Sequence, residues 1–421
     1  MRVCLATGTV GAPFAFDGGS QRAQHEFARR LVDRGCEVLT VCCLPPTKLE
    51  LILRNTRQLS APVQVIEPGQ PVDPLGRVPG RSNVCLISRH GSAITVGASA
   101  SDVLPLCRHA ISQYRPDVVM TWLGAAQDII RMAEEHHVPA VLRLFDPGNP
   151  QAYPRSVGAK ATVIANAPVT AQAATRYYGR PAPFIVEPVD HRCYELAERT
   201  GDRVTFVNPT WPKGVALVCE IAKRLPHVPF LVVRGWSWVA RAHELAVCRE
   251  TLASLPNVQV VGPLADMREA YRRTKLVLMP SRWLEAWGRV VCEAQASGIP
   301  AIASSRGSLP LNVGDGGIIL DYGDPQLWAQ VIDQLYHDPQ LYEQLSDKAR
   351  RNIERFPFQT LIDRYVDLLM HVGAGKSVSV DQPRGPVTIC RAQRNGAGRV
   401  IFVEQSIDWD DVVDLADPEH P

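Results

Sequence analysis

Short apolar segments alternate with amphipathic ones along the first half of the chain. Residues 2–7 form an apolar run, and after it Phe27, Leu31 and Val32 recur at helical spacing before Gly35. Further apolar runs lie at 36–44, 117–122, 139–145 and 161–167. This alternation predicts parallel strands joined by right-handed helical crossovers. Residues 45–80 are rich in proline and glycine and are expected to form loops, apart from a short strand at 63–68.

A second series of the same kind begins at Arg203. Its strands are predicted at 203–209, 229–235, 257–264 and 276–281, and helices are predicted at 325–356 and 358–372. The segment 182–196 is expected to hold the last strand of the first series and the crossing into the second. We therefore predict an α/β protein with two Rossmann-like domains, residues 1–187 and 188–372.

The extension at 373–421 has a different pattern. Two apolar stretches flank a glycine turn, which predicts a hairpin that lies at a sheet edge or forms an oligomer contact; a loosely ordered end is the alternative. The acidic triplet Asp408-Trp409-Asp410 imitates a metal-binding Asp-x-Asp motif. Its place in an acidic terminus indicates solvated charge instead.

The strongest chemical signal lies between Ser281 and Ser304. Glu285 and Glu293 are eight residues apart around the pair Trp287-Gly288. We expect Glu285 in a loop and Glu293 inside the following helix, so that free backbone N–H groups and the positive end of the helix dipole lie between the acids. Carboxylates accept paired sugar hydroxyls, and helix N-termini bind phosphate. The pattern therefore suits a nucleotide-sugar, although an amphipathic helix with solvated glutamates would also carry two acids.

Composition narrows the class of protein. The chain has 421 residues, 46% hydrophobic residues and a net charge of +2, which gives no electrostatic reason to expect a nucleic-acid partner. Its eleven cysteines are scattered and odd in number, so we expect reduced thiols in a cytoplasmic protein. No apolar run reaches the length of a membrane span, and no signal peptide is expected before the first strand.

With its flanking residues, the segment around the two glutamates resembles the Glu-x7-Glu signature of retaining glycosyltransferases of the GT-B fold, family 4. The matching positions are Pro280, Ser281, Glu285, Gly288, Glu293, Ala294, Gly298, Pro300 and Ser304, with Trp287 where the family usually has Phe. The resemblance covers about residues 1–372 and is strongest at 203–320. It implies two Rossmann-like domains facing each other across a cleft, the second of which binds the donor.

The resemblance also implies roles for individual residues. Glu285 would hold the hydroxyls of the donor sugar, and Glu293 those of the ribose. Lys213, in the Lys-Gly pair of a strand–helix loop, would neutralise the diphosphate together with the backbone of Trp287, Gly288 and Arg289. No metal or other cofactor is then required, and a uridine diphosphate sugar is the favoured donor.

Further positions are expected to complete the donor site. Asn208 stands near a position where family members commonly have an arginine, so Arg234 or Arg306 is a candidate for the second cation. Gly19 matches the family's Gly-Gly loop after the first strand, and Gly262 lies in the loop that flanks the nucleobase.

The sugar and acceptor sides depart from the family pattern. Ser308 and Leu311 replace a glycine and a glutamate of the family, which predicts unusual sugar recognition. Asp146 follows a strand where many relatives have a histidine; it is a candidate for contact with acceptor or sugar, or else a loop-capping residue ahead of Pro147.

The acceptor pocket is expected to be shaped by loops at 45–80 and 81–100. Arg81, Arg89 and Trp122 are the side chains expected nearby.

The predicted function is transfer of a sugar, with retention and without metal, from a nucleotide-sugar to an acceptor hydroxyl. Two other classes remain open. One is a pseudo-glycosyltransferase or an epimerase of the GT-B fold, which would use the same donor cleft. The other is a non-catalytic protein that binds nucleotide-sugars. The sequence defines neither the acceptor nor the oligomeric state.

Overall fold

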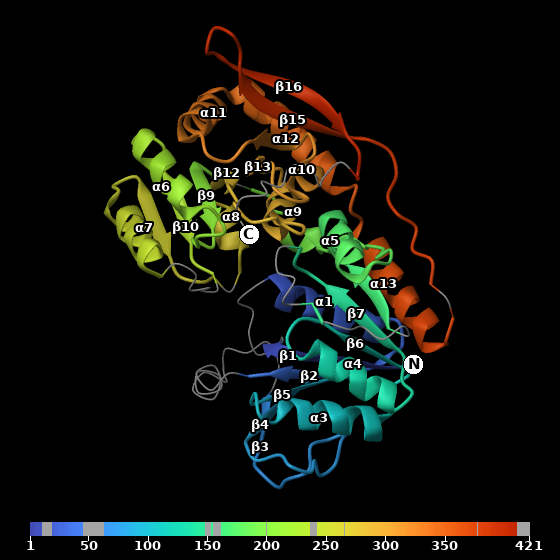
Figure 1. The fold of residues 1–421 in the computed structure, drawn as a ribbon. Helices are drawn as coiled ribbons and strands as arrows, with labels where there is room; N and C mark the ends of the chain where they lie inside the picture. Colours follow the sequence, from blue (N-terminus) through green and yellow to red (C-terminus); the bar gives the residue numbers. More distant parts are fainter. Residues whose placement is uncertain are drawn as a thin grey trace. The chain divides into compact units, whose positions relative to one another are not determined.

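The computed structural model describes residues 1–10, 19–44, 63–147, 153–154, 161–198, 200–235, 242–264, 266–376 and 378–410. The chain divides into two compact units. The first consists of Met1–Asn166, Thr170–Ile185 and Gln359–Gln382, and the second of Ala167–Val169, Val186–Phe358 and Pro383–Pro421. Each unit is built on one eight-stranded, mostly parallel sheet (Figure 1). The predicted α/β class with two Rossmann-like halves is confirmed.

The sheet of the first unit has the order β3-β4-β5-β2-β1-β6-β7-β8. Its strands are β1 Arg2–Val10, β2 Glu37–Cys43, β3 Val63–Ile66, β4 Cys85–His90, β5 Ala93–Ala98, β6 Val118–Thr121, β7 Ala140–Leu144 and β8 Thr162–Ala165. The helices are α1 Gly19–Asp33, α3 Val103–His109, α4 Ala126–Glu135, α5 Pro168–Tyr178 and α13 Phe358–Gly373, with a π-helical turn at Ala110–Tyr114. Five predicted strands and the short strand at 63–68 are present, but near Phe184 only an isolated bridge to Ala165 forms.

The region expected to be a loop at 81–100 is instead an antiparallel hairpin of β4 and β5, and β5 pairs in parallel with β2. Arg81 is buried and donates hydrogen bonds to backbone carbonyls, among them those of Ile66 and Asn83. Trp122 is buried as well, and Arg89 forms an exposed ion pair with Asp73. Arg81 and Trp122 thus pack inside the unit, and their expected place near an acceptor pocket stays a prediction. Residues 45–62 lie outside the described part of the chain.

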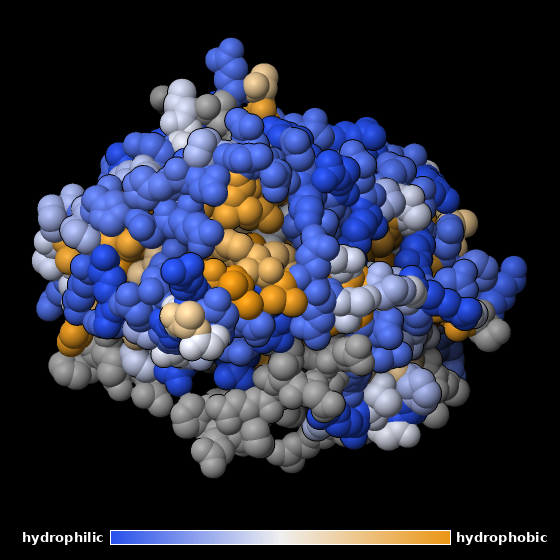
Figure 2. Space-filling view, turned by 90° about the horizontal axis from the view of Figure 1, so that it is seen from above, coloured by the Kyte–Doolittle hydropathy of each residue, from blue (hydrophilic) through white to orange (hydrophobic). Residues whose placement is uncertain are grey.

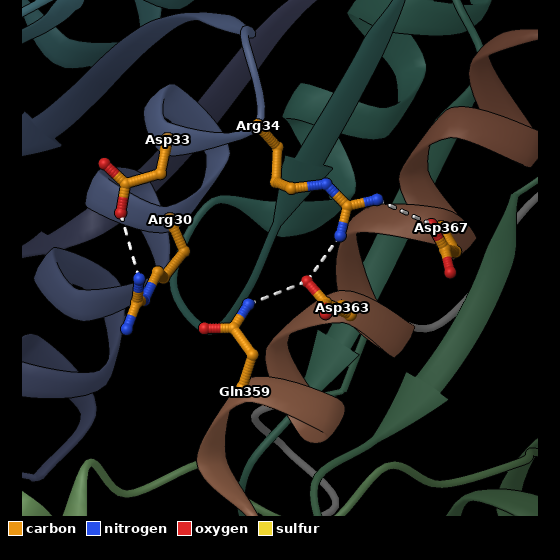
Figure 3. Close-up of polar contacts among 6 residues, drawn as sticks. All are labelled: Arg30, Asp33, Arg34, Gln359, Asp363 and Asp367. Atoms are coloured by element: carbon orange, nitrogen blue, oxygen red, sulfur yellow. Dashed lines mark hydrogen bonds and ion pairs between the residues drawn. The ribbon is translucent and has the colours of Figure 1, made fainter.

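Helix α13 belongs to the first unit, although its sequence follows the second series of strands. Arg34, just beyond α1, forms ion pairs with Asp363 and Asp367 of α13, and Gln359 donates to Asp363 over 3.0 Å (Figure 3). The hydroxyl of Tyr365 donates to the Ile185 carbonyl over 2.8 Å. The contacts thus group α13 with the first unit, because the amphipathic pattern of a helix does not say which core its apolar face joins; the domain boundaries at 187 and 372 stay predictions.

The sheet of the second unit has the order β11-β10-β9-β12-β13-β14-β15-β16. Its strands are β9 Arg203–Val207, β10 Phe230–Val233, β11 Val258–Val261, β12 Thr274–Met279, β13 Ala301–Ser304, β14 Gly317–Leu320, β15 Val387–Arg394 and β16 Val400–Ile407. The helices are α6 Val215–Arg224, α7 Ala242–Ser254, α8 Arg268–Tyr271, α9 Arg289–Gln295, α10 Leu309–Val313, α11 Pro325–His337 and α12 Pro339–Ile353, with a 3-10 turn at His191–Tyr194. The helix predicted at 325–356 is split, because the Asp338 carboxylate caps α12 at the N–H of Leu341 and Pro339 opens it.

The carboxy-terminal extension completes this second sheet. β15 pairs in parallel with β14 and in antiparallel with β16, so the predicted edge hairpin is confirmed (Figure 1). Ion pairs from Arg391 to Asp321 and from Lys348 to Glu404, both 2.7 Å long, attach it to the unit.

Each unit has its own apolar core, and polar residues dominate the face seen in Figure 2, where apolar side chains gather in a patch near the centre. All eleven cysteines are free, and nine are buried. Among the described residues, no helix combines the length and the apolar character needed to cross a bilayer.

Candidate active site

The topology of the second unit defines where a ligand would bind. β10 and β11 follow β9 on one side, whereas β12, β13 and β14 extend the sheet on the other. The direction of winding therefore switches between β9 and β12, which are parallel neighbours. In open α/β sheets, ligands bind outside the carboxyl ends of the strands at such a switch point. Lys213 follows β9, and Glu285 follows β12.

Lys213 and Glu285 meet at this switch point. The Lys213 ammonium forms an ion pair with Oε1 of Glu285, and the same oxygen accepts a hydrogen bond from the Ser281 hydroxyl over 2.7 Å. The side chain of Glu285 is 7% exposed and that of Lys213 is 24% exposed. The pair is thus removed from bulk water while its lysine keeps some access to it, so the charge is little screened.

The two loops that carry this pair are pressed together by their backbones. The N–H groups of Arg282 and Trp283 both donate to the Pro212 carbonyl. Gly214 has a φ of +83°, and a Cβ at this position would lie 1.8 Å from the Pro280 carbonyl oxygen. Glycine is therefore required next to Lys213 both for its left-handed conformation and for the close approach.

A third loop, after β13, contacts the backbone of Glu285. The N–H of Ser308 donates to the Glu285 carbonyl over 2.9 Å, and a Cβ on Gly307 would lie 2.2 Å from the same oxygen. Arg306 comes just before this contact and is half-buried. Burial raises the pKa of the Tyr322 hydroxyl, and the positive charges of Arg282 and Arg306 lower it by a smaller amount. The Arg282 guanidinium carbon lies 5.3 Å from the centroid of the Trp211 ring and 5.4 Å from that of the Tyr322 ring.

Glu293 is placed inside α9, as predicted. Its Oε2 accepts a 2.7 Å hydrogen bond from the hydroxyl of Tyr271, and its Oε1 lies 3.6 Å from Nε of Arg289. Only 5% of the residue is exposed. A carboxylate oxygen can accept more than one hydrogen bond, so these partners orient Glu293 and leave acceptor capacity for a ligand.

Arg289 is the first residue of α9 and its side chain is buried. Besides Glu293, its guanidinium contacts the Pro188 carbonyl over 3.1 Å and approaches Glu187 at 4.0 Å. These partners lie within the unit, so the side chain orients α9 and the predicted donor contact is left to the backbone.

The pair Trp287-Gly288 forms the turn into α9, with Gly288 as its N-cap. The amide of Asn312 donates to the carbonyls of both residues, the second over 3.0 Å. The Trp287 ring is buried against Phe356 at 4.9 Å and is stacked on Trp409 of the extension at 6.5 Å. The contact that we predicted between Trp287 and the donor can therefore come only from its backbone in this arrangement.

Three more predicted residues lie after neighbouring strands of the same edge. Asn208 follows β9 with a φ of +63°, and its carbonyl accepts the N–H of Thr210 in a tight turn. Arg234 follows β10 and is exposed, and Gly262 follows β11. A Cβ on Gly262 would lie 3.6 Å from the Arg234 guanidinium, so these two residues are adjacent.

Two predicted residues belong to the first unit. Asp146 follows β7 and is half-buried, and its carbonyl accepts a 2.7 Å hydrogen bond from the Tyr153 hydroxyl. Gly19 is the first residue of α1, whereas Gly18 lies outside the described residues. Their predicted roles at the acceptor and the donor stay predictions.

Several supporting residues escaped the sequence analysis. Ser281 lies in the recognised segment, but the pattern assigns it no hydrogen bond. Tyr271 and Asn312 come from α8 and α10, distant in sequence, and no local spacing signals their contacts.

Cys292, beside Glu293, is buried. Burial raises the pKa of its thiol to about 12, so the thiol stays protonated and is no nucleophile.

The sequence of the second unit is similar to that of known glycosyltransferases. Residues 203–352 match the model of the family described as glycosyl transferases group 1. The D-inositol 3-phosphate glycosyltransferase of Corynebacterium kroppenstedtii is 30% identical over 167 residues, which cover 38% of this chain and 34% of the relative. The chain thus spans about a third of that relative. The Rhodococcus erythropolis enzyme of the same name is 28% identical over 319 residues, covering 66% of this chain and 72% of the relative.

Solved structures extend the likeness to the whole fold. The Anabaena protein HepE in complex with UDP and glucose superposes with a TM-score of 0.66 at 18% identity, covering 88% of this chain and 99% of that one. The catalytic domain of starch synthase IV from Arabidopsis thaliana, bound to ADP and acarbose, has a TM-score of 0.66 at 12% identity and covers 89% and 99%. At these identities the likeness establishes the fold, which is the GT-B fold of glycosyltransferases.

Proposed function

We propose that this chain, whose residues 203–352 match the family model of glycosyl transferases group 1, is a member of that family and transfers a sugar from a nucleotide-sugar to an acceptor hydroxyl with retention of configuration. The observation that carries the proposal is the Lys213–Glu285 pair at the switch point of a parallel sheet. A cation held there is available to a leaving diphosphate, and a carboxylate beside it is available to sugar hydroxyls.

In the proposed reaction, the bond between the anomeric carbon and the diphosphate oxygen breaks. A bond to the acceptor oxygen forms on the same face, and the acceptor proton passes to an oxygen of the departing diphosphate. Negative charge grows on that diphosphate in the transition state. Lys213 would stabilise it at a site where water is largely excluded, and such preorganised charges are among the largest contributions to catalysis.

The remaining residues would bind and orient the donor. Glu285 would accept hydrogen bonds from the sugar, and Glu293, oriented by Tyr271, would accept those of the ribose. Arg234, exposed beside Gly262, and Arg306 are the candidates for the second cation. We expect turnover without added metal, because these side chains supply the counter-charge. UDP is the first nucleotide to test, since the Anabaena structure contains it.

The test is donor hydrolysis. Purified protein is incubated with UDP- and ADP-sugars, with and without a chelator, and nucleoside diphosphate release is followed. We expect slow release from at least one donor, accelerated by the right acceptor. D-Inositol 3-phosphate, named in the relatives, is the first acceptor to try. Binding of donors without any release would contradict the proposal and favour a non-catalytic protein, and an epimerised donor would favour an epimerase.

A further inference from the structure

A cluster of three potential metal ligands lies away from the residues discussed so far. His227 is in the turn between α6 and β10, and Asp333 and His337 are one helical turn apart on α11. Nε2 of His227 lies 2.7 Å from Oδ1 of Asp333, and Nδ1 of His337 lies 3.3 Å from the same oxygen. The three ligand atoms are within 4.8 Å of one another.

We propose that His227, Asp333 and His337 form a binding site for a divalent transition metal of the zinc class. Two imidazole nitrogens and one carboxylate oxygen are a ligand set that zinc accepts, with water in the fourth position. Bonds of about 2.0–2.1 Å at tetrahedral angles place neighbouring ligand atoms about 3.4 Å apart. The 3.3 Å separation between His337 and Asp333 already has this value.

The contacts of Asp333 with the two histidines would have to change on metal binding, whereas the two histidine nitrogens are already within 4.8 Å of each other. His227 and Asp333 must separate by about 0.7 Å from their hydrogen-bonded distance to reach the tetrahedral spacing. Nδ1 of His337 also hydrogen-bonds to the Asp333 carbonyl over 3.0 Å and must give up this contact. Both histidine side chains are about half exposed, 51% for His227 and 57% for His337, so neither ring is enclosed in the core.

The position of the cluster indicates what a bound metal would do. His227 precedes β10, whereas Arg234 follows it, so the cluster lies at the end of this strand opposite to the proposed donor site. The ligands come from two segments that are 106 residues apart in the sequence. Metal binding would therefore join the turn before β10 to α11 and stabilise the second unit, and it would take no part in the transfer reaction.

The chain contains a matched control on α13. His371 follows Asp367 at the same spacing, and its Nδ1 hydrogen-bonds to the Asp367 carbonyl over 2.7 Å, as His337 does to Asp333. Within the described residues this second pair belongs to no group of three ligands. It reproduces the helical half of the site without the third ligand.

The experiment is a calorimetric titration of ZnCl2 into the full chain, free of affinity tags and stripped of metal, with melting curves recorded in parallel. We expect one zinc ion per chain and a higher melting temperature with zinc. His227→Gln and His337→Gln should each weaken binding by about tenfold or more and abolish the shift, whereas His371→Gln should change neither. Because the three histidines are exposed, melting without zinc should be the same in all variants.

Two results would overturn the proposal. Wild-type protein that shows neither zinc binding nor a melting shift would mean that the cluster is only a hydrogen-bonded surface pair. Zinc binding that persists unchanged in both His227→Gln and His337→Gln would place the metal elsewhere, for instance on the exposed Cys193. Neither result bears on donor hydrolysis.

Discussion

The two units share a winding pattern but differ at the point where the winding switches. In the second unit the switch lies between β9 and β12, and the loops beyond them bring together Lys213 and Glu285. In the first unit it lies between β1 and β6. There the N–H of Gly8 donates to the Gly124 carbonyl over 2.7 Å, and the described residues beyond β6, 122–125, carry no charge.

This difference shows what the fold supplies and what the side chains add. The backbone alone places an opening at each switch point. In the first unit the described backbone segments after β6 and within β1 approach each other closely, because a Cβ on Gly8 would lie 2.6 Å from the Gly124 carbonyl oxygen. In the second unit glycine at 214 permits a still closer contact beside the ion pair, since a Cβ there would lie 1.8 Å from the Pro280 carbonyl oxygen. Among the residues that the structure describes at the two switch points, charged side chains rather than topology therefore distinguish the proposed donor site.

The sharpest test of this comparison is Lys213→Met. We expect nucleoside diphosphate release to fall about 100- to 1000-fold, because one preorganised charge on the leaving group is lost. The substitution also leaves Glu285 buried without its cation, which destabilises a protein by about 3–5 kcal/mol. The double variant Lys213→Met/Glu285→Gln is the control, since it should recover the melting temperature and not the activity. Activity that returns with stability would assign Lys213 a structural role only.

The packing at the second switch point is tested by Gly214→Ala. A Cβ would meet the Pro280 carbonyl at 1.8 Å and stand on a backbone with positive φ, so we expect a loss of stability of about 2–4 kcal/mol. The control is Gly398→Ala in the β15–β16 turn, where φ is +75° and nothing lies within 4 Å. It carries only the conformational cost, about 1–2 kcal/mol. Equal denaturant midpoints for the two variants would contradict the close approach.

The sequence predicted the second unit better than the first for a physical reason. Glu285, Gly288 and Glu293 lie at fixed spacing around the turn into α9, and Lys213 lies next to Gly214 in another loop, so each group leaves a local pattern in the sequence. Other contacts form only on folding, between residues distant in sequence, and no local spacing predicts them; they are those of Tyr271, Asn312 and Arg81. The hairpin at β4–β5 was missed because its short apolar strands follow a segment rich in proline and glycine. The membership of α13 was missed because an amphipathic helix does not encode its partner.

Glu293 provides a test of binding rather than turnover. Glu293→Gln replaces an acceptor-only carboxylate by an amide, and we expect UDP to bind about tenfold more weakly, equivalent to about 1.4 kcal/mol. Tyr271→Phe removes the hydrogen bond that orients Glu293 and keeps its charge, so its effect should be smaller. Calorimetry with UDP measures both. Wild-type affinity in Glu293→Gln would remove this residue from the proposed ribose contact.

Asp146 tests the first unit. If it contacts the acceptor, Asp146→Asn should leave donor hydrolysis in water unchanged and slow transfer to an acceptor about tenfold, the effect of one lost charged hydrogen bond. The ratio of transfer to hydrolysis is the measurement. An equal loss in both rates would place Asp146 at the donor, and no loss in either would support the alternative that it caps the loop ahead of Pro147.

The smallest expected effect comes from the carboxy-terminal extension, which lies outside the matched family region. Trp409 stacks on the buried Trp287, next to the turn into α9, and the Arg355 guanidinium lies 5.9 Å from the Trp409 ring. Aromatic pairs of this kind are worth about 0.5–1.5 kcal/mol. Trp409→Ala should therefore lower the melting temperature by about 2–4 °C. Val403→Ala, an exposed position on β16, should leave it unchanged. If UDP affinity falls along with the melting temperature, the extension supports the turn at Trp287-Gly288, and the second switch point depends on residues that the family pattern does not include.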